Sequence, residues 1–210
     1  MRHRLLSHRG CWTHGLAKNS APALARSFAA GYGVETDVRD CAGALLISHD
    51  APRPPLMTLQ ELLALASAGA PGRPTLALNI KADGLADMLA PLLRPHAQLD
   101  CFVFDMAVPD MRAYFAAGIP VFARLSEVEP VPAWLDRCAG VWLDAFETEW
   151  YGMADIEALL EQGKRVCVVS PELHGRAHRA LWSALKPVAH HPRFLLCTDH
   201  PDVALEFFGG

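Results

Sequence analysis

Two carboxylate side chains, Glu35 and Asp37, stand two residues apart in an apolar segment of the chain. If this segment is a β-strand, its period of two places both side chains on the same face. Two like charges that face one interior repel each other unless a cation lies between them. Carboxylate oxygens suit magnesium, calcium or manganese, whereas zinc prefers thiolates or several histidines. The pair therefore predicts a site for a hard divalent cation.

A histidine followed at once by arginine and glycine, His8-Arg9-Gly10, ends the first apolar segment. Histidine suits proton transfer because its ordinary pKa lies near neutral pH. Arginine offers a fork of donors for a phosphate group, and glycine frees the backbone at that point. A buried, hydrogen-bonded histidine is the alternative for His8 alone, but the run as a whole predicts acid–base chemistry beside a phosphate.

Polar side chains also stand at the ends of the other apolar segments. They are His49, Asn79 with Lys81, Asp105, Arg124, Asp144, Ser170 with Glu172, and Asp199. A single acidic residue among them could equally cap a helix or form a salt bridge. Whether they act together depends on the arrangement of the segments that carry them.

Short apolar runs of strand length alternate with segments of helical period along the whole chain. The expected strands are Arg4–Ser7, Gly33–Val38, Leu76–Ile80, Cys101–Phe104, Val121–Arg124, Val141–Leu143, Val166–Val169 and Phe194–Cys197. The expected helices are Ala21–Ala30, Leu59–Ala68, Leu85–Leu92, Asp110–Ala117, Met153–Glu161, Ala177–Leu185 and Asp202–Phe207. Such alternation predicts a parallel sheet with helical crossovers. Eight strands in about 200 residues favour an α/β fold closed into a TIM-type (β/α)8 barrel over an open doubly wound sheet.

The remaining segments fit one barrel domain that spans residues 1–210. The run Ala44–Ser48 follows a turn-forming stretch and is expected to be a very short excursion after the second strand. The segment Val131–Cys138 is too brief for an eighth helix, and the Pro-rich stretch Ala51–Leu56 is too short for an interdomain linker. In a parallel barrel the carboxyl ends of the strands meet at one face, which would gather the polar residues into one site.

The composition excludes several classes of protein. With 51% hydrophobic and 20% charged residues the chain can bury a sizeable core. A net charge of -4 with scattered basic residues argues against a nucleic-acid partner. The absence of a long apolar stretch predicts no membrane span and a cytoplasmic location. Six single cysteines without a CxxC pair predict free thiols, and the oligomeric state stays open.

Four motif elements occur in order along the first quarter of the chain. They are His8-Arg9-Gly10, Lys18-Asn19-Ser20 at the start of a helix, Glu35-Thr36-Asp37-Val38, and His49-Asp50. Their order and spacing resemble the signature of the glycerophosphodiester phosphodiesterase family. The later strand Leu78-Asn79-Ile80-Lys81 is similar to the family's Glu-x-Lys strand and extends the resemblance to residue 81.

The resemblance implies a metal-dependent phosphodiesterase that hydrolyses a glycerophosphodiester or a related small-molecule phosphodiester without an organic cofactor. The implied roles are His8 and His49 as the acid–base pair, Arg9 and Lys81 as phosphate contacts, and Glu35, Asp37, Asn79 and Asp105 as ligands or charge partners of a divalent metal ion, magnesium, calcium or manganese. In such a site the metal polarises the phosphoryl oxygen, while one imidazole deprotonates the nucleophile and the other protonates the leaving alkoxide.

Two positions depart from the family's pattern. Lys18 and Asn79 each stand where the family has a glutamate, and Asn79 corresponds to a metal ligand. An amide oxygen can still bind calcium or magnesium, but with lower affinity. Asp105 or Asp144 could supply the missing negative charge. The short stretch Asp50–Met57 leaves little room for the family's inserted subdomain, which implies an open pocket.

Three alternatives stay open at this point. Attack by a hydroxyl group of the substrate would give a cyclic phosphate instead of hydrolysis. A catalytically impaired barrel could bind a phosphorylated ligand or a protein partner, which Lys18 and Asn79 favour and the two histidines oppose. A Schiff-base enzyme that uses Lys81 would leave the carboxylate pair and both histidines without roles.

Overall fold

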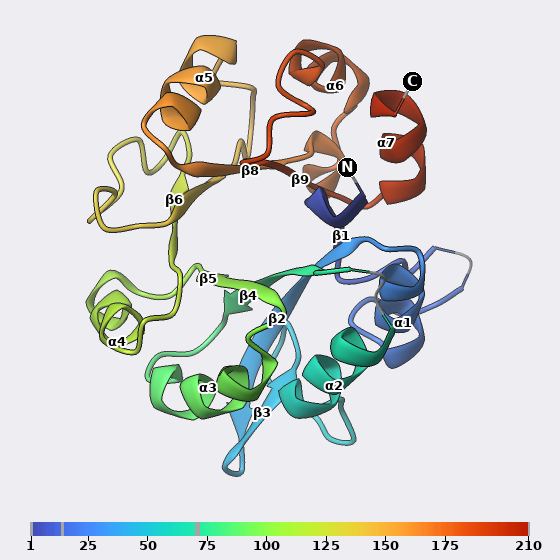
Figure 1. The fold of residues 1–210 in the computed structure, drawn as a ribbon, viewed down its shortest axis with the longest axis vertical. Helices are drawn as coiled ribbons and strands as arrows, with labels where there is room; N and C mark the ends of the chain where they lie inside the picture. The colour runs from blue at the N-terminus through green and yellow to red at the C-terminus, as the bar shows by residue number, and fades with distance from the viewer. Residues whose placement is uncertain (1, 14, 70–71, 210) are drawn as a thin grey trace.

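The computed structural model describes residues 2–13, 15–69 and 72–209, and its strands form one sheet (Figure 1). The strands are β1 (Leu5–His8), β2 (Gly33–Cys41), β3 (Ala44–Ile47), β4 (Thr75–Ile80), β5 (Asp100–Phe104), β6 (Phe122–Leu125), β7 (Gly140–Leu143), β8 (Arg165–Val169) and β9 (Phe194–Thr198). All eight predicted strands and the predicted excursion are confirmed, with ends shifted by at most three residues.

The sheet is a nearly closed parallel barrel. Its strand order is β5-β4-β2-β1-β9-β8-β7-β6, and every neighbouring pair in this series is parallel. The two ends of the series meet where Val103 bridges Val121 and donates its N–H to the carbonyl of Pro120 at 2.9 Å. The excursion strand β3 lies outside this ring and pairs antiparallel with β2. The predicted TIM-type barrel is therefore confirmed.

Helices surround the barrel on its outer side (Figure 1). They are α1 (Ala21–Ala29), α2 (Leu59–Gly69), α3 (Ala86–Leu93), α4 (Met111–Ala116), α5 (Met153–Glu161), α6 (Arg179–Leu185) and α7 (Pro201–Phe208). Each overlaps a predicted helix. Turns, and no helix, connect β6 to β7 in the described segment 126–139, as the short sequence there predicts. No helix of the described residues is long and apolar enough to cross a membrane.

The predicted starts of α1 and α2 are confirmed by their caps. Ser20 accepts a hydrogen bond from the Ala23 N–H at 3.4 Å, ahead of a helix whose second residue is proline. The Glu61 N–H donates to the Thr58 hydroxyl at 3.1 Å, and the Thr58 N–H donates to the Glu61 carboxylate at 2.8 Å. This reciprocal pair is a capping box, which satisfies backbone donors that the first helical turn leaves free.

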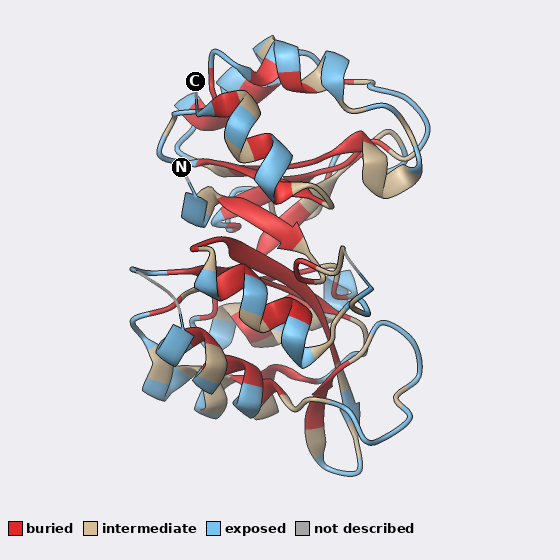
Figure 2. Cartoon of the chain, turned by 90° about the vertical axis from the view of Figure 1, so that its right-hand side faces the viewer, coloured by how far each residue is buried: buried red, intermediate tan, exposed pale blue. Residues whose placement is uncertain are grey.

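Alternation along the strands divides their side chains between the barrel interior and the layer under the helices, and both sets are buried. Figure 2 shows the strands coloured as buried over most of their length. The apolar interior consists of Leu6, Ala77, Phe102, Phe104, Phe122, Trp142, Cys167, Val169, Leu195 and Cys197. Within it, Phe102 stacks on Phe122 with ring centroids 3.7 Å apart, and Phe104 stacks on Trp142 at 4.0 Å. The barrel interior is therefore a packed core and not a channel.

A layer of polar side chains lies directly above this apolar layer, at the carboxyl end of the barrel. In five of the strands, the position two residues after an apolar interior residue is polar: His8 after Leu6, Asn79 after Ala77, Arg124 after Phe122, Asp144 after Trp142, and Asp199 after Cys197. The period of two in the strands thus directs these side chains into the barrel mouth.

All six cysteines are free thiols, as predicted. Cys167 and Cys197 lie in the apolar interior of the barrel, where burial raises the pKa of each thiol well above its ordinary value. A thiol in this setting packs as a small apolar group and has little tendency to react.

Candidate functional site

The structure pairs His8 with an acidic residue from the opposite end of the chain. His8 Nδ1 lies 2.7 Å from Asp199 Oδ1, because β1 and β9 are neighbours in the sheet. Trp12 donates its indole N–H to the same oxygen at 3.3 Å, and Lys18 Nζ lies 3.6 Å from the other oxygen. Asp199 was recognised in the sequence as a polar strand end but not as a partner of His8. Their separation of 191 positions along the chain hides the pair from any local pattern.

The two members of this pair shift in pKa for opposing reasons. Burial lowers the pKa of His8, against the raising effect of the hydrogen bond to Asp199. Burial alone would raise the pKa of Asp199, but the hydrogen bond from His8 and the charge of Lys18 lower it below its ordinary value. The result is a neutral imidazole beside an ionised carboxylate at neutral pH.

Glu35 is buried beneath His8. Its side chain is 3% exposed, and its Oε2 atom lies 3.9 Å from His8 Nε2. Burial, together with the neighbouring charge of Asp37, raises the pKa of Glu35 to about 8 against the opposing effects of Arg9 and Lys81. Without a further positive charge, Glu35 therefore holds its proton at neutral pH.

Asp37 is surrounded by cationic and amide groups. Arg9 Nε lies 2.9 Å from one carboxylate oxygen, and Lys81 Nζ lies 3.4 Å from the other. Asn19 donates its amide N–H to Asp37 at 2.9 Å and accepts the Thr36 hydroxyl at 2.7 Å. Both Arg9 and Asn19 adopt positive φ angles of 58° and 59°, an uncommon conformation for residues other than glycine. The backbone is thus bent to direct these two side chains at one carboxylate.

Asn79 and Asp105 complete the predicted ligand set. Asn79 is the register partner of Asp37 on the neighbouring strand β4, and Asp105 follows β5 with a positive φ of 66°. Burial raises the pKa of Asp105, although Arg124 and Lys81 oppose the shift. The sequence-predicted ligands Glu35, Asp37, Asn79 and Asp105 therefore all lie at the same end of the barrel.

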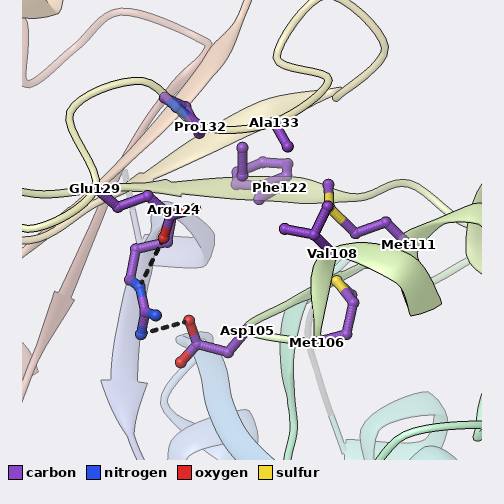
Figure 3. A pocket seen from close by; sticks show the side chains of 10 residues that line it. Asp105, Met106, Val108, Met111, Phe122, Arg124, Glu129, Pro132 and Ala133 are labelled. Atoms are coloured by element: carbon purple, nitrogen blue, oxygen red, sulfur yellow. Dashed lines mark hydrogen bonds and ion pairs between the residues drawn. The ribbon is translucent and has the colours of Figure 1, made fainter.

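Arg124 links Asp105 to the loop after β6 (Figure 3). Its guanidinium lies 3.2 Å from Asp105 and 3.4 Å from Glu129. The three side chains border a small cavity of about 40 Å³, whose other walls include Met106 and Phe122. A cavity of this volume has room for a few water molecules, but it is too small for a substrate.

The four predicted metal ligands share one unusual feature. Each has a buried oxygen without a hydrogen-bond partner among the described residues: Glu35 Oε2, Asp37 Oδ1, Asn79 Oδ1 and Asp105 Oδ1. Two of these oxygens have a cation nearby, Lys81 Nζ at 3.4 Å from Asp37 Oδ1 and Arg124 at 3.2 Å from Asp105 Oδ1. Buried oxygens without donors are costly, and a hard divalent cation would relieve that cost. The donor set therefore fits such a cation in chemistry and burial. In this structure, however, no three His, Cys, Asp or Glu side chains of the described residues are gathered closely enough to hold a metal ion.

His49 lies at the same end of the barrel but does not contact the buried cluster. The N–H of the preceding residue, Ser48, donates to the carbonyl of Asp37 at 3.0 Å, which holds the loop beside β2. The His49 side chain itself is 46% exposed, and its Nδ1 atom lies 2.9 Å from Asp50. The proximity of the two histidines, which the resemblance implies, stays a prediction.

Polar residues on the opposite side of the mouth form a second group, of which the sequence suggested a role only for Asp144, as a replacement for the missing negative charge. His174 Nε2 lies 2.7 Å from Asp144 Oδ1, and Phe146 packs edge-on against the imidazole. Glu172 accepts hydrogen bonds from the hydroxyls of Ser170 and Thr198 and from the Asp199 N–H. Glu172 thus fixes the backbone beside the partner of His8.

Comparison with solved structures finds the same fold in proteins described as phosphodiesterases. The glycerophosphodiester phosphodiesterase from Agrobacterium tumefaciens str. C58 matches at a TM-score of 0.71 and 17% identity, over 100% of both chains. A phosphodiesterase from Oleispira antarctica, in complex with its product sn-glycerol-3-phosphate, matches at 0.72 and 17%, over 99% of this chain and 97% of that one. A glycerophosphodiester phosphodiesterase from Parabacteroides distasonis ATCC 8503 matches at 0.69 and 17%, over 98% and 96%.

No family model matches the chain, and a search of curated proteins finds no match. The fold implied by the sequence resemblance is therefore confirmed by structure, at an identity that shows the fold alone.

Proposed function

We propose that the protein is a metal-dependent phosphodiesterase that hydrolyses a glycerophosphodiester or a related small phosphodiester. The observation that carries the proposal is the His8–Asp199 pair, whose imidazole lies 3.9 Å from the buried carboxyl group of Glu35. Two cations, Arg9 and Lys81, meet at the neighbouring Asp37. One end of the barrel thus carries groups that could transfer a proton, bind a cation and bind a phosphate. The fold shared with phosphodiesterases of known structure supports this assignment.

His8 is the proposed proton-transfer group. A hydrogen bond from Nδ1–H to Asp199 would fix the imidazole tautomer and leave Nε2 free to accept a proton. The lowered pKa of His8 keeps this nitrogen unprotonated at neutral pH, as a general base requires. In the proposal His8 deprotonates the nucleophile and His49, from the loop that Ser48 anchors to Asp37, protonates the leaving alkoxide.

Arg9 and Lys81 are the proposed phosphate contacts. Both now neutralise Asp37, so a phosphodiester would compete with that carboxylate for their positive charge. Arg9 carries a fork of donors, and Lys81 acts as a point charge, two modes that are both common in phosphate binding. Their side chains are about one-fifth exposed, which leaves a path for a ligand from the barrel mouth.

Glu35, Asp37, Asn79 and Asp105 would hold the divalent metal ion through the buried oxygens of their side chains. A bound ion of this kind polarises a phosphoryl oxygen and neutralises charge that develops on it. The oxygen-only donor set favours magnesium, calcium or manganese. Because Glu35 must lose its proton before it binds a cation, metal affinity should rise with pH towards about 8.

The test is hydrolysis of bis-p-nitrophenyl phosphate and of glycerophosphodiesters, with EDTA or with added magnesium, calcium or manganese. We expect activity only with a metal, and a loss on the order of 10²- to 10⁴-fold in the His8→Ala variant. His190→Ala is the matched control, because His190 is exposed and lies outside the site. Activity that survives both EDTA and His8→Ala would overturn the proposal. Analysis of the products would separate hydrolysis from formation of a cyclic phosphate.

A catalytically impaired barrel is the second candidate. Lys18 lies against Asp199, and no compact metal cluster is gathered among the described residues, which favours ligand binding without turnover. In that case inorganic phosphate would bind in the mouth, and no metal would give hydrolysis. His8→Ala would then leave the phosphate affinity nearly unchanged, whereas Arg9→Gln would weaken it.

The free state of all six cysteines suits a reducing compartment, so we propose a cytoplasmic location for either function.

A further inference from the structure

The amino end of the barrel, opposite the candidate site, contains a basic cavity of about 340 Å³. Its lining includes His3, Arg4, Arg73, Thr75, Asp100 and Arg165. These residues stand at or just before the starts of β1, β4, β5 and β8, so four separate segments of the chain meet there. The volume lies within the range of small-ligand pockets, roughly 300–1,000 Å³. We call it the amino-end cavity.

The carboxylate in this lining is fully engaged. Arg165 donates two hydrogen bonds to Asp100, at 2.9 and 2.6 Å, and Thr75 donates a third at 2.8 Å. The same guanidinium lies 5.6 Å from the ring of Phe102 and 5.5 Å from that of Phe122, below the aromatic layer. Arg165 and Asp100 thus form a structural pair that closes the barrel from below, and Asp100 has little capacity left for other cations.

The other two arginines lack a carboxylate partner. Arg4 donates to the carbonyl of His191, and Arg73 donates to the carbonyl of Leu99 at 3.3 Å. In the described part of the chain no carboxylate forms a salt bridge with either guanidinium, whereas Arg165 is paired with Asp100. Arg4 is half-buried, and this burial lowers its pKa, whereas Arg73 is exposed. Both guanidinium groups therefore keep a positive charge that an anion in the cavity could contact.

We propose that the amino-end cavity binds a small molecule through a phosphate group of at least two negative charges. Such a group would compensate Arg4 and Arg73 and accept from their guanidinium forks, and the imidazole of His3 borders the same space. The cavity is separated from the candidate site by the packed interior of the barrel, so its ligand is not the substrate of that site. The inference does not depend on the proposed function.

The experiment is calorimetric titration with pyrophosphate of a protein that carries Lys81→Gln, which weakens phosphate binding at the opposite end. In this background we expect one binding site. Arg4→Gln and Arg73→Gln should each weaken binding on the order of tenfold, the effect of one lost charged hydrogen bond. Arg112→Gln, which makes the same charge change on the exposed side of α4, should leave the affinity unchanged.

Three results would overturn the inference: no binding of pyrophosphate, equal binding by the Arg4→Gln and Arg73→Gln variants, or equal weakening by Arg112→Gln. Tighter binding of malonate than of pyrophosphate would overturn the assignment to phosphate. Circular dichroism and the midpoint of thermal unfolding show whether each variant is folded. Arg73 is exposed, so its substitution removes a charge without disturbing the core.

Discussion

The carboxyl end and the amino end of the barrel are both rich in charged groups, but they differ in which groups have no partner. At the carboxyl end, Asp37 and Asp105 are paired with cations, whereas one oxygen of the buried Glu35 has no hydrogen-bond partner among the described residues. At the amino end, Arg4 and Arg73 have only carbonyl partners, whereas Arg165 and Asp100 satisfy each other. Completed pairs support the fold. The groups without such a partner support the two proposals made above, that the carboxyl end binds a cation and a phosphodiester and that the amino end binds a phosphate group. The following variants test this division.

The largest expected effect comes from Glu35, whose proton is held in the folded state. Its pKa is about 8 in the folded protein, against an ordinary value of 4.5. The bound proton therefore makes its full contribution to the free energy of unfolding below pH 4.5, and this contribution is lost as the pH rises through about 8. Within that window the metal-free protein should lose on the order of 1 kcal/mol per pH unit from this group. Urea unfolding in EDTA across this range should show the loss, and Glu35→Gln should abolish it.

Glu157→Gln is the matched control for this measurement, because Glu157 is exposed on α5. It should leave the pH dependence of stability as it is in the unmodified protein. If Glu35→Gln gave a curve parallel to that of the control, burial of an unpartnered carboxyl group at the carboxyl end would be refuted.

A smaller loss is expected at the amino end, where Arg165→Ala breaks a completed pair. The substitution leaves Asp100 without its two charged hydrogen bonds and uncovers the aromatic layer. We expect the free energy of unfolding to fall by about 2 kcal/mol. The rate of phosphodiester hydrolysis per folded molecule should not change. A selective loss of turnover, without a loss of stability, would show that the two ends do not have the separate roles described above.

Asp199→Asn should lower kcat/KM about tenfold, because the substitution disturbs the orientation of His8 but leaves the imidazole in place. Asp199 raises the pKa of His8, so its removal should also move the acid limb of the pH profile to lower pH. The pH dependence of kcat/KM measures both effects. Asp87→Asn on the exposed side of α3 is the control, and an unshifted profile in Asp199→Asn would contradict a positioning role.

The smallest effect tests a feature that belongs to neither end. Thr58→Ala removes the hydroxyl that accepts the Glu61 N–H at the start of α2. The expected cost is about 1 kcal/mol in the free energy of unfolding, with activity and pyrophosphate binding unchanged. Thermal unfolding measures it. A change in activity or in pyrophosphate binding would mean that a loss of stability elsewhere in the fold also alters the two ends of the barrel, so that variants there could not be assigned to local contacts.

The fold was predictable from the sequence because every strand is a short apolar run bounded by turn or helix signals. The period of two also predicted that Glu35 and Asp37 share one face. In the structure Glu35 lies 3.9 Å from His8, and Asp37 contacts Arg9 and Lys81, all at the carboxyl end of the barrel. Even the missing helix before β7 follows from the few residues available there. These features depend on neighbours in the sequence, so local patterns suffice to find them.

Contacts between distant segments could not be predicted in the same way. The partner of His8 is 191 residues away, and His174 and Asp144 belong to successive strand ends that carry no shared motif. The outward direction of His49 depends on a side-chain torsion and on the adjacent Asp50, which spacing along the chain cannot determine. The cations that surround Asp37 likewise become visible only when β2 and β4 are placed side by side.

The junction between β5 and β6 affects how readily the protein can associate with other copies of itself. The sheet is a strip of eight strands, and among the described residues the β-bridge between its two margins is the one between Val103 and Val121. If thermal motion opened this junction, two rows of unpaired backbone groups would be uncovered at once, and such rows recruit strands from other chains. Self-association on mild heating should therefore begin at this junction, before the rest of the barrel unfolds.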